Sequence, residues 1–120
     1  MVRAPQQGEL IWLSFTPQRG REQAGRRPAL VLSASAYNAK VGLALVCPIT
    51  SRAKGYPFEV PLPESCEVKG VVLADQLRSL DWRAREAELI ARAPAGVLDD
   101  VQKLVRTLLG PSKPPTSKTT

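Results

Sequence analysis

Residues 22–28 hold a possible acid/base group and two phosphate-binding side chains close together. They read Glu-Gln-Ala-Gly-Arg-Arg-Pro, so the carboxylate of Glu22 lies near Arg26 and Arg27, and Gly25 lets the backbone turn between them. A guanidinium group can bind two phosphate oxygens and stays protonated, which suits it to stabilising charge on a reacting phosphate. Taken alone, an arginine-rich loop with one glutamate is more often a solvated surface with marginal ion pairs.

The composition narrows the chemistry that these residues can perform. The chain has no histidine, which excludes Ser-His-Asp and Cys-His hydrolases, and it has no phosphate loop of the P-loop type. Its two cysteines, Cys47 and Cys66, are far apart, so we expect no zinc site, no other metal and no cofactor. Phosphodiester cleavage in RNA remains open, because the 2′-hydroxyl of the substrate is the nucleophile and the protein supplies positioning, a proton acceptor and positive charge.

The charge balance and the apolar runs indicate the type of partner and the compartment. A formal charge of +6 makes a polyanion a plausible partner through phosphate neutralisation, although many basic domains bind no nucleic acid. The chain does not open with a signal-like segment, and no apolar run approaches the roughly 20 residues that span a bilayer. We therefore expect a cytoplasmic protein without membrane contact.

Short β-rich runs, rather than helical patterns, dominate the part of the chain that must position these residues. The expected strands cover residues 9–15, 29–32, 41–49, 57–61, 70–73 and about 87–91, with a turn or short helix at 33–40. Residues 18–28 are charged and contain two glycines, which predicts a long loop of the kind that often carries function. Cys47 is expected to be a small buried residue of its strand, whereas Cys66 lies in a polar loop.

One amphipathic helix is predicted from about residue 95 to residue 109, because apolar residues recur there at helical spacing. Pro94 suits its first turn and Gly110 its end. Its apolar face could pack on the core or against a second copy, and core packing is the preferred interpretation. Strands followed by one helix favour a small barrel with a packed helix, formed by a single domain at residues 1–110. Residues 111–120 contain no apolar residue, which predicts a disordered polar tail.

Blocks of the sequence, taken in order, resemble the MazF/PemK family of toxins, and the MazF branch most closely. Residues 8–12 read Gly-Glu-Leu-Ile-Trp, and residues 22–29 read Glu-Gln-Ala-Gly-Arg-Arg-Pro-Ala, as in the opening signatures of the family. Residues 47–51, Cys-Pro-Ile-Thr-Ser, are similar to a family block built on Pro and Thr, and residues 54–60 are close to one MazF branch. Residues 70–82 contain an Asp-Gln-Leu-Arg-Ser stretch that resembles the next block. The resemblance covers essentially residues 8–110.

This resemblance implies a fold, an activity and partners. The implied fold is a small SH3-like β-barrel of the PemK/CcdB type with a C-terminal helix. Proteins of this family are usually homodimers, and they cleave single-stranded RNA or mRNA at short motifs. A MazE-like antitoxin normally binds and neutralises such a toxin. The catalytic arginine of the family falls on Arg27, its catalytic threonine on Thr50, and the acidic residue of the MazF branch on Glu22. We expect Arg27 to stabilise charge on the phosphorane and Thr50 to donate a hydrogen bond to a non-bridging oxygen. Glu22 would accept the proton of the 2′-hydroxyl, with water as another possible acceptor.

Other side chains are candidates for contacts with RNA bases or backbone. These are Phe15, Arg26, Ser51, Gln76 and Arg78. Phe15 fits the core equally well. Asp75 is interpreted as holding its loop through hydrogen bonds to backbone, because an arginine that precedes this aspartate in the PemK branch is Leu73 here. Of the two tryptophans that could stack on bases, Trp12 is expected to be buried and Trp82 to be more open.

Two other functions remain open at this stage. A CcdB-like toxin, which binds gyrase through its C-terminal helix, has a barrel of the same type, but the helix of such toxins ends in Trp-Gly-Ile and this one ends in Leu-Leu-Gly. A non-catalytic nucleic-acid-binding barrel would use the arginines and would not require Glu22 or Thr50.

Overall fold

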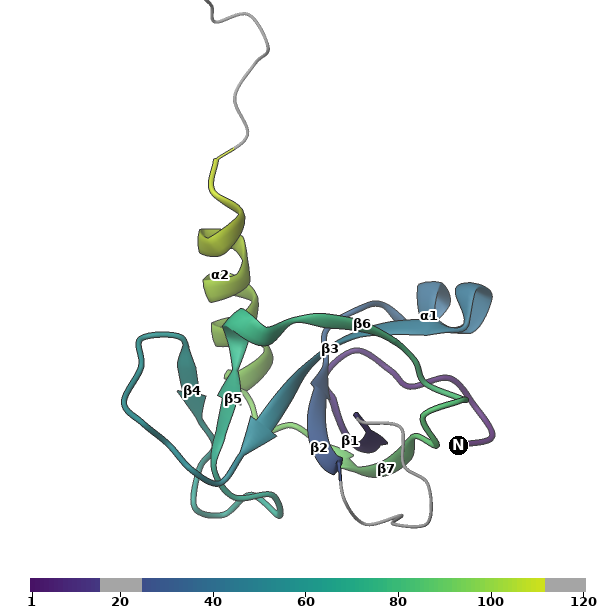
Figure 1. The fold of residues 1–120 in the computed structure, drawn as a ribbon, viewed down its shortest axis with the longest axis horizontal. Coiled ribbons are helices and arrows are strands. Elements are labelled where there is room, and N and C mark those ends of the chain that lie inside the picture. Colours follow the sequence, from purple (N-terminus) through teal and green to yellow (C-terminus); the bar gives the residue numbers. More distant parts are fainter. Residues whose placement is uncertain (16–24, 112–120) are drawn as a thin grey trace, which may run out of the picture.

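The computed structural model describes residues 1–15 and 25–111, and most of these residues belong to or surround an antiparallel sheet (Figure 1). The strands are β1 Glu9–Ser14, β2 Arg26–Val31, β3 Leu43–Thr50, β4 Glu59–Pro61, β5 Val71–Leu73, β6 Arg78–Asp81 and β7 Glu88–Arg92. They pair in the order β4-β5-β3-β2-β1-β7, and β6 pairs with β3 beside β5. Two helices, α1 at Ser35–Val41 and α2 at Val97–Leu109, complete the described part of the chain.

The predicted class, mainly β with a C-terminal helix, is confirmed, but the sheet is not closed into a barrel. Within residues 1–15 and 25–111, the outer strands β4 and β7 do not pair with each other. A physical reason lies in β4, which is only three residues long and ends at Pro61. Proline has no backbone N–H to donate, so this edge offers little for a further strand to bind.

The central strands are buried on both faces, because successive side chains of a strand point to opposite sides. Leu10 of β1 belongs to one apolar cluster, which includes Leu30 and Ile49 and which α2 covers with Val97 and Val101. Neighbouring residues of β1 belong to a second cluster on the other face. That cluster also contains residues of β2, β3 and β6 and the segment before β7: Ile11, Leu13, Phe15, Ala29, Val31, Ala44, Val46, Leu80, Trp82 and Ala87.

Helix α2 packs on the sheet through its first and central turns, and its last turn is exposed. It lies near β4 and the short 3-10 turn η1 (Ala74–Gln76), whereas α1 lies at the other end of β3 (Figure 1). Val97 and Val101 are buried, while Leu108 and Leu109 are exposed, so core packing accounts for part of the apolar stripe. The helix ends before Gly110 as predicted. No helix in the described part of the chain is long and apolar enough to cross a membrane.

Most of the predicted strands are present, with two differences. Residues 78–81 were given no element, yet they form β6 by pairing with the start of β3. Residues 26–28 were assigned to a loop, but they extend β2 because they pair with β1. Of the other residues in that predicted loop, 18–24 lie outside the described residues and only Gly25 is described. Residues 112–120 of the predicted tail also lie outside the described residues.

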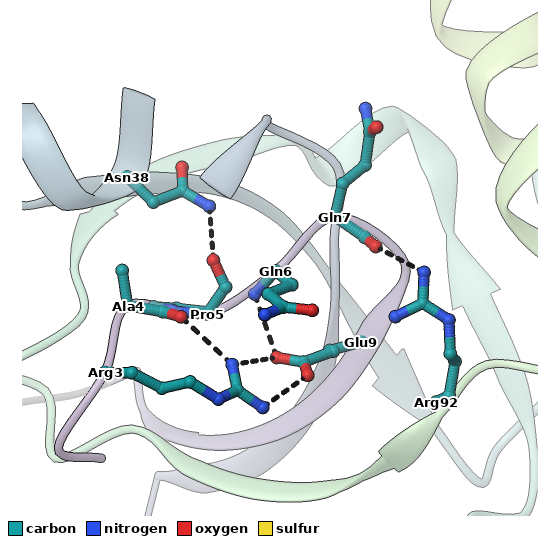
Figure 2. Close-up of polar contacts among 8 residues, drawn as sticks. All are labelled: Arg3, Ala4, Pro5, Gln6, Gln7, Glu9, Asn38 and Arg92. Carbon is teal, nitrogen blue, oxygen red and sulfur yellow. Dashed lines mark hydrogen bonds and ion pairs between the residues drawn. The ribbon is translucent and has the colours of Figure 1, made fainter. Parts of the chain in front are cut away.

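A buried carboxylate attaches the N-terminal residues to the start of β1 (Figure 2). Two nitrogens of the Arg3 guanidinium donate to the carboxylate of Glu9 at 3.2 and 2.7 Å, and the backbone N–H of Gln6 donates to it at 2.8 Å. Burial opposes the charge of Glu9, but these hydrogen bonds outweigh it and hold its pKa below the ordinary value. The side-chain amide of Asn38 in α1 donates to the carbonyl of Pro5 at 2.8 Å, so the same N-terminal segment is also held to α1.

The prediction for the two tryptophans was wrong, because Trp82 is the buried one and Trp12 the more exposed one. Trp82 is only 3% exposed, and its indole N–H donates to the backbone carbonyl of Asn38 at 2.9 Å. Its charged neighbours along the chain remain at the surface, and Arg83 lies over the ring at 5.0 Å from the centroid. Trp12 is 39% exposed, because it lies one strand repeat beyond Leu10 and outside the cluster that α2 covers. Burial here depends on the tertiary cover, which flanking residues do not reveal.

Candidate active site

Arg27 and Thr50, which are distant in the sequence, line one pocket of about 620 Å³. The pairing of β1 with β2 and of β2 with β3 brings their residues to the same end of the sheet. The described residues that line it are Trp12, Arg27, Pro28, Ile49, Thr50, Ser51, Arg52 and Lys69. Among these described residues there are three cationic side chains and no carboxylate, so the pocket favours an anionic ligand.

Thr50 is the last residue of β3, and its hydroxyl has a defined orientation. The hydroxyl oxygen accepts a hydrogen bond from the backbone N–H of Arg52 at 3.1 Å. A hydroxyl group has one hydrogen to donate as well as its acceptor positions. The Thr50 hydroxyl can therefore donate to an oxygen of a bound anion while Arg52 keeps it in place.

A glycine makes close contact with Thr50 from the neighbouring segment. Gly70 has φ +122°, and a Cβ atom built on it would lie 2.0 Å from the backbone oxygen of Thr50 and 2.9 Å from the Cα of Ser51. The carbonyl of Gly70 accepts from the N–H of Leu62 at 2.9 Å, which fixes the approaching segment from its other side. Only a residue without a side chain allows this approach.

Arg27 lies next to a rigid end of the β1–β2 pair. It is paired with Leu13 of β1, and the N–H of Phe15 donates to the carbonyl of Gly25 at 2.8 Å just beyond. The guanidinium of Arg85 donates to the carbonyls of Ser14 and Phe15 at 3.2 and 2.5 Å. Arg85 thereby holds the chain next to the backbone that carries Arg27.

Arg26, predicted to contact RNA, takes part in the same end of the strand pair and is not in the pocket lining. Its guanidinium donates to the carboxylate of Glu88 at 2.9 Å, to the backbone carbonyl of Glu86 at 3.0 Å and to the hydroxyl of Ser14 at 3.3 Å. With three partners on β1 and around β7, Arg26 is engaged in holding strands together.

The other predicted contact residues lie in different places. Ser51 lines the pocket beside Thr50. Phe15 is a buried member of the second cluster, and the guanidinium of Arg78 lies over its ring at 5.3 Å from the centroid. Gln76 is exposed in η1, outside the lining. Glu22 lies outside the described residues.

The carboxylate of Asp75 lies close enough to the thiol of Cys47 to affect the pKa of that thiol. Within the described residues, Asp75 makes no side-chain hydrogen bond, so the predicted bonds to its loop backbone are not seen. Cys47 is fully buried as predicted, and burial, with a smaller effect from the charge of Asp75, raises its pKa to about 12. Cys47 therefore stays protonated at neutral pH and has no role as an acid or base.

Sequence reasoning did not assign the aromatic residue and two of the cations to the pocket. Trp12 was assigned to the core, while Arg52 and Lys69 received no role, although they directly follow Ser51 and precede Gly70. The ammonium of Lys69 also contacts the backbone carbonyl of Glu64, which is not part of the described lining. The sequence did contain a clue to both cations, because Arg52 directly follows the family block at residues 47–51 and Lys69 directly precedes the block at residues 70–82.

Comparison with known proteins places this arrangement in a family. The sequence model described as "PemK-like, MazF-like toxin of type II toxin-antitoxin system" matches residues 6–109. The chain belongs to this family. Two curated members are similar along most of their length, and both come from Escherichia coli K12. The chain is 46% identical to "Endoribonuclease toxin MazF" over 106 residues, which covers 88% of this chain and 95% of the relative. It is 42% identical to "Endoribonuclease toxin ChpB", covering 79% of this chain and 85% of the relative.

Solved structures of MazF proteins share the fold. The chain matches the crystal structure of MazE-MazF (Form-III) from Deinococcus radiodurans with a TM-score of 0.82 and 60% identity, covering 91% of this chain and 99% of that chain. It matches MazF (Form-I) from the same organism with a TM-score of 0.82 and 62% identity, covering 90% and 98%. The MazF-like fold expected from the sequence is thus confirmed.

Proposed function

We propose that this chain is a sequence-specific endoribonuclease toxin that cleaves single-stranded RNA, including mRNA, by attack of the substrate's own 2′-hydroxyl. One observation carries the proposal: Arg27 and Thr50 line the same cationic pocket in a chain whose curated relatives are named endoribonucleases. The volume of about 620 Å³ lies in the range of small-ligand sites, which accommodates one or two nucleotides in an extended strand. We propose that the protein acts in the cytoplasm, where mRNA is translated.

In the proposed reaction the RNA backbone lies across the pocket with the scissile phosphate between Arg27 and Thr50. The 2′ oxygen attacks phosphorus, the bond from phosphorus to the 5′ oxygen breaks, and the leaving oxygen takes up a proton. The products are a 2′,3′-cyclic phosphate and a 5′-hydroxyl end. Arg27 stabilises the charge of the phosphorane, and the hydroxyl of Thr50 donates to a non-bridging oxygen.

The proton of the 2′-hydroxyl needs an acceptor, and we propose Glu22 for this role. The proposal rests on the match of residues 22–29 to the family pattern. Every residue that lines the described pocket lacks a carboxylate, so an acceptor from elsewhere in the chain or from water is required. No metal ion is needed for these steps, because cationic side chains supply the positive charge.

The function is tested with purified protein and a long single-stranded RNA in the presence of EDTA. Wild type should cut at a recurring short motif, and Arg27→Ala and Thr50→Ala should each lower the rate by about 100-fold or more, as expected when a group that stabilises transition-state charge is removed. Arg83→Ala is the matched control, since Arg83 is exposed over Trp82 and does not line the pocket. Absence of cleavage by folded wild type would contradict the proposal and favour the binding-only alternative.

The same proposal includes two protein partners. We propose that the toxin is a homodimer, and that a MazE-like antitoxin neutralises it, since relatives have been crystallised as MazE-MazF. An acidic, flexible antitoxin segment would match the three cations of the pocket. Binding of RNA should also weaken steeply with salt, because phosphates displace counterions. The gyrase-binding alternative gains no support from these relatives.

A further inference from the structure

The indole ring of Trp12 is unusual because it is exposed in the middle of a buried strand. Its neighbours Leu10, Ile11 and Leu13 are completely buried, whereas Trp12 is 39% exposed. A tryptophan side chain carries a large apolar surface whose burial is favourable. The fold leaves this surface open at one place, and that place is the pocket that also holds Arg27 and Thr50.

Strand pairing on both sides fixes the backbone that carries Trp12. Strand β1 lies between two partners, and Trp12 is paired with Pro28 on β2 and with Glu88 on β7. Proline restricts the backbone on one side, and on the other side Glu88 is tied to Arg26 by an ion pair of 2.9 Å. A tryptophan side chain has only two rotatable bonds, so it can bind a flat ligand with little loss of side-chain freedom.

The pocket combines this flat apolar surface with positive charge. Among the described residues of the lining, Trp12 is the only aromatic one, and the others include three cations and the hydroxyls of Thr50 and Ser51. Single-stranded nucleic acids are bound by this combination, in which cations contact the phosphates and an aromatic ring stacks on a base. A peptide carboxylate would use the cations but would not need the flat ring.

We infer that Trp12 is the stacking platform for a nucleobase next to the scissile phosphate. The inference rests on the proposed function and adds the residue that positions one nucleotide of the substrate. Stacking does not distinguish strongly among bases, because every base has a π face. Trp12 therefore contributes affinity and positions the nucleotide, while polar groups at the rim read the base edges.

The test measures binding of an RNA oligonucleotide that contains the mapped cleavage motif with a 2′-deoxy nucleotide at the cleavage position, so that it binds without being cut. Trp12→Ala should weaken binding by about 5- to 150-fold, the range for loss of one stacked base. Trp12→Phe, which keeps an aromatic face, should stay within a few fold of wild type. Trp12→Leu keeps apolar area without the aromatic face and should behave like Trp12→Ala.

Fluorescence supplies an independent measurement, because the chain has only two tryptophans. The oligonucleotide should quench the emission of wild type. In Trp12→Phe the remaining tryptophan is the buried Trp82, so the quenching should disappear. Thermal unfolding of each variant shows that the fold is retained, and unchanged quenching in Trp12→Phe would overturn the inference.

Cleavage assays on the same samples separate the inference from the function on which it rests. If wild type cleaves RNA and Trp12→Ala binds and cleaves as wild type does, the stacking role is wrong and the endoribonuclease proposal stands. If wild type does not cleave RNA, the proposed function fails, whatever the affinity. If Trp12 emission changes with protein concentration but not with oligonucleotide, the ring is covered by a second copy, and the inference is overturned.

Discussion

Replacing Gly70 by alanine should both destabilise the protein and damage the pocket. The new Cβ atom would lie 2.0 Å from the oxygen, 2.7 Å from the carbon of the Thr50 carbonyl and 2.9 Å from the Cα of Ser51. All three atoms belong to the backbone, so no side chain can rotate away to make room. The β3–β5 pairing, where Thr50 lies opposite Val71, must shift instead.

Two costs add up in this variant. An alanine at φ +122° pays a backbone strain of about 1–3 kcal/mol. Forcing extra volume into a packed site costs a further ~1–3 kcal/mol. Since 1 kcal/mol changes Tm by about 4–8 °C in a domain of roughly 100 residues, Gly70→Ala should lower Tm by about 10 °C or more.

Gly42→Ala is the matched control, because it separates strain from steric overlap. Gly42 also has a positive φ, +81°, but nothing lies within 4 Å of the position of its added Cβ. It should lose only about 1–2 kcal/mol from the left-handed backbone. Both variants are melted at one protein concentration, since dimerisation would make Tm depend on concentration.

Cleavage by the two variants is then compared well below their melting temperatures. Gly70→Ala should cleave RNA far more slowly than Gly42→Ala, because the displaced backbone carries Thr50. Equal Tm values for the two variants would refute the argument from the close contact. A lower Tm with normal cleavage would show that Thr50 tolerates the shift.

Three further predictions concern groups outside the pocket. Arg85→Gln should lower kcat with little change in thermal stability, because it frees the strand end beside Arg27; a change in KM alone would count against this positioning role. Glu9 has a lowered pKa, so its contribution to stability is complete above the unfolded glutamate pKa of about 4.3 and is lost as pH falls through the folded value. Wild type should thus lose stability on acidification more steeply than Glu9→Gln in urea unfolding at a series of pH values, and parallel curves would contradict this. Cys47 is buried and its pKa is raised to about 12, so it should resist iodoacetamide in the native protein at pH 8 and react only in denaturant. Mass spectrometry locates the label, and labelling of Cys47 in the folded protein would show that it is not buried.

The main strands could be predicted from sequence because their apolar residues are contiguous, as in β3, or alternate, as in β4. Strand β6, Arg-Ser-Leu-Asp, has one apolar residue and owes its structure to pairing with β3, which no local pattern contains. The same limit applies to Trp12 and Trp82, whose burial depends on where α2 and α1 lie.

The candidate site was predicted in part. Arg27 and Thr50 were named through the family resemblance, and their common pocket depends on the order of strands β1, β2 and β3, which residue spacing does not give. The position of Arg26 could not be foreseen either, because its partner Glu88 belongs to a strand far along the chain.

The contact between Gly70 and Thr50 also defines which positions an engineer can vary to change RNA preference. Arg52 and Lys69 are exposed at the rim, so a combinatorial library can randomise both without disturbing the sheet. Every amino acid other than glycine carries a Cβ, so a library that included position 70 would consist almost entirely of destabilised clones with a displaced Thr50. Selection should therefore keep that codon fixed and place all its diversity in the side chains around it.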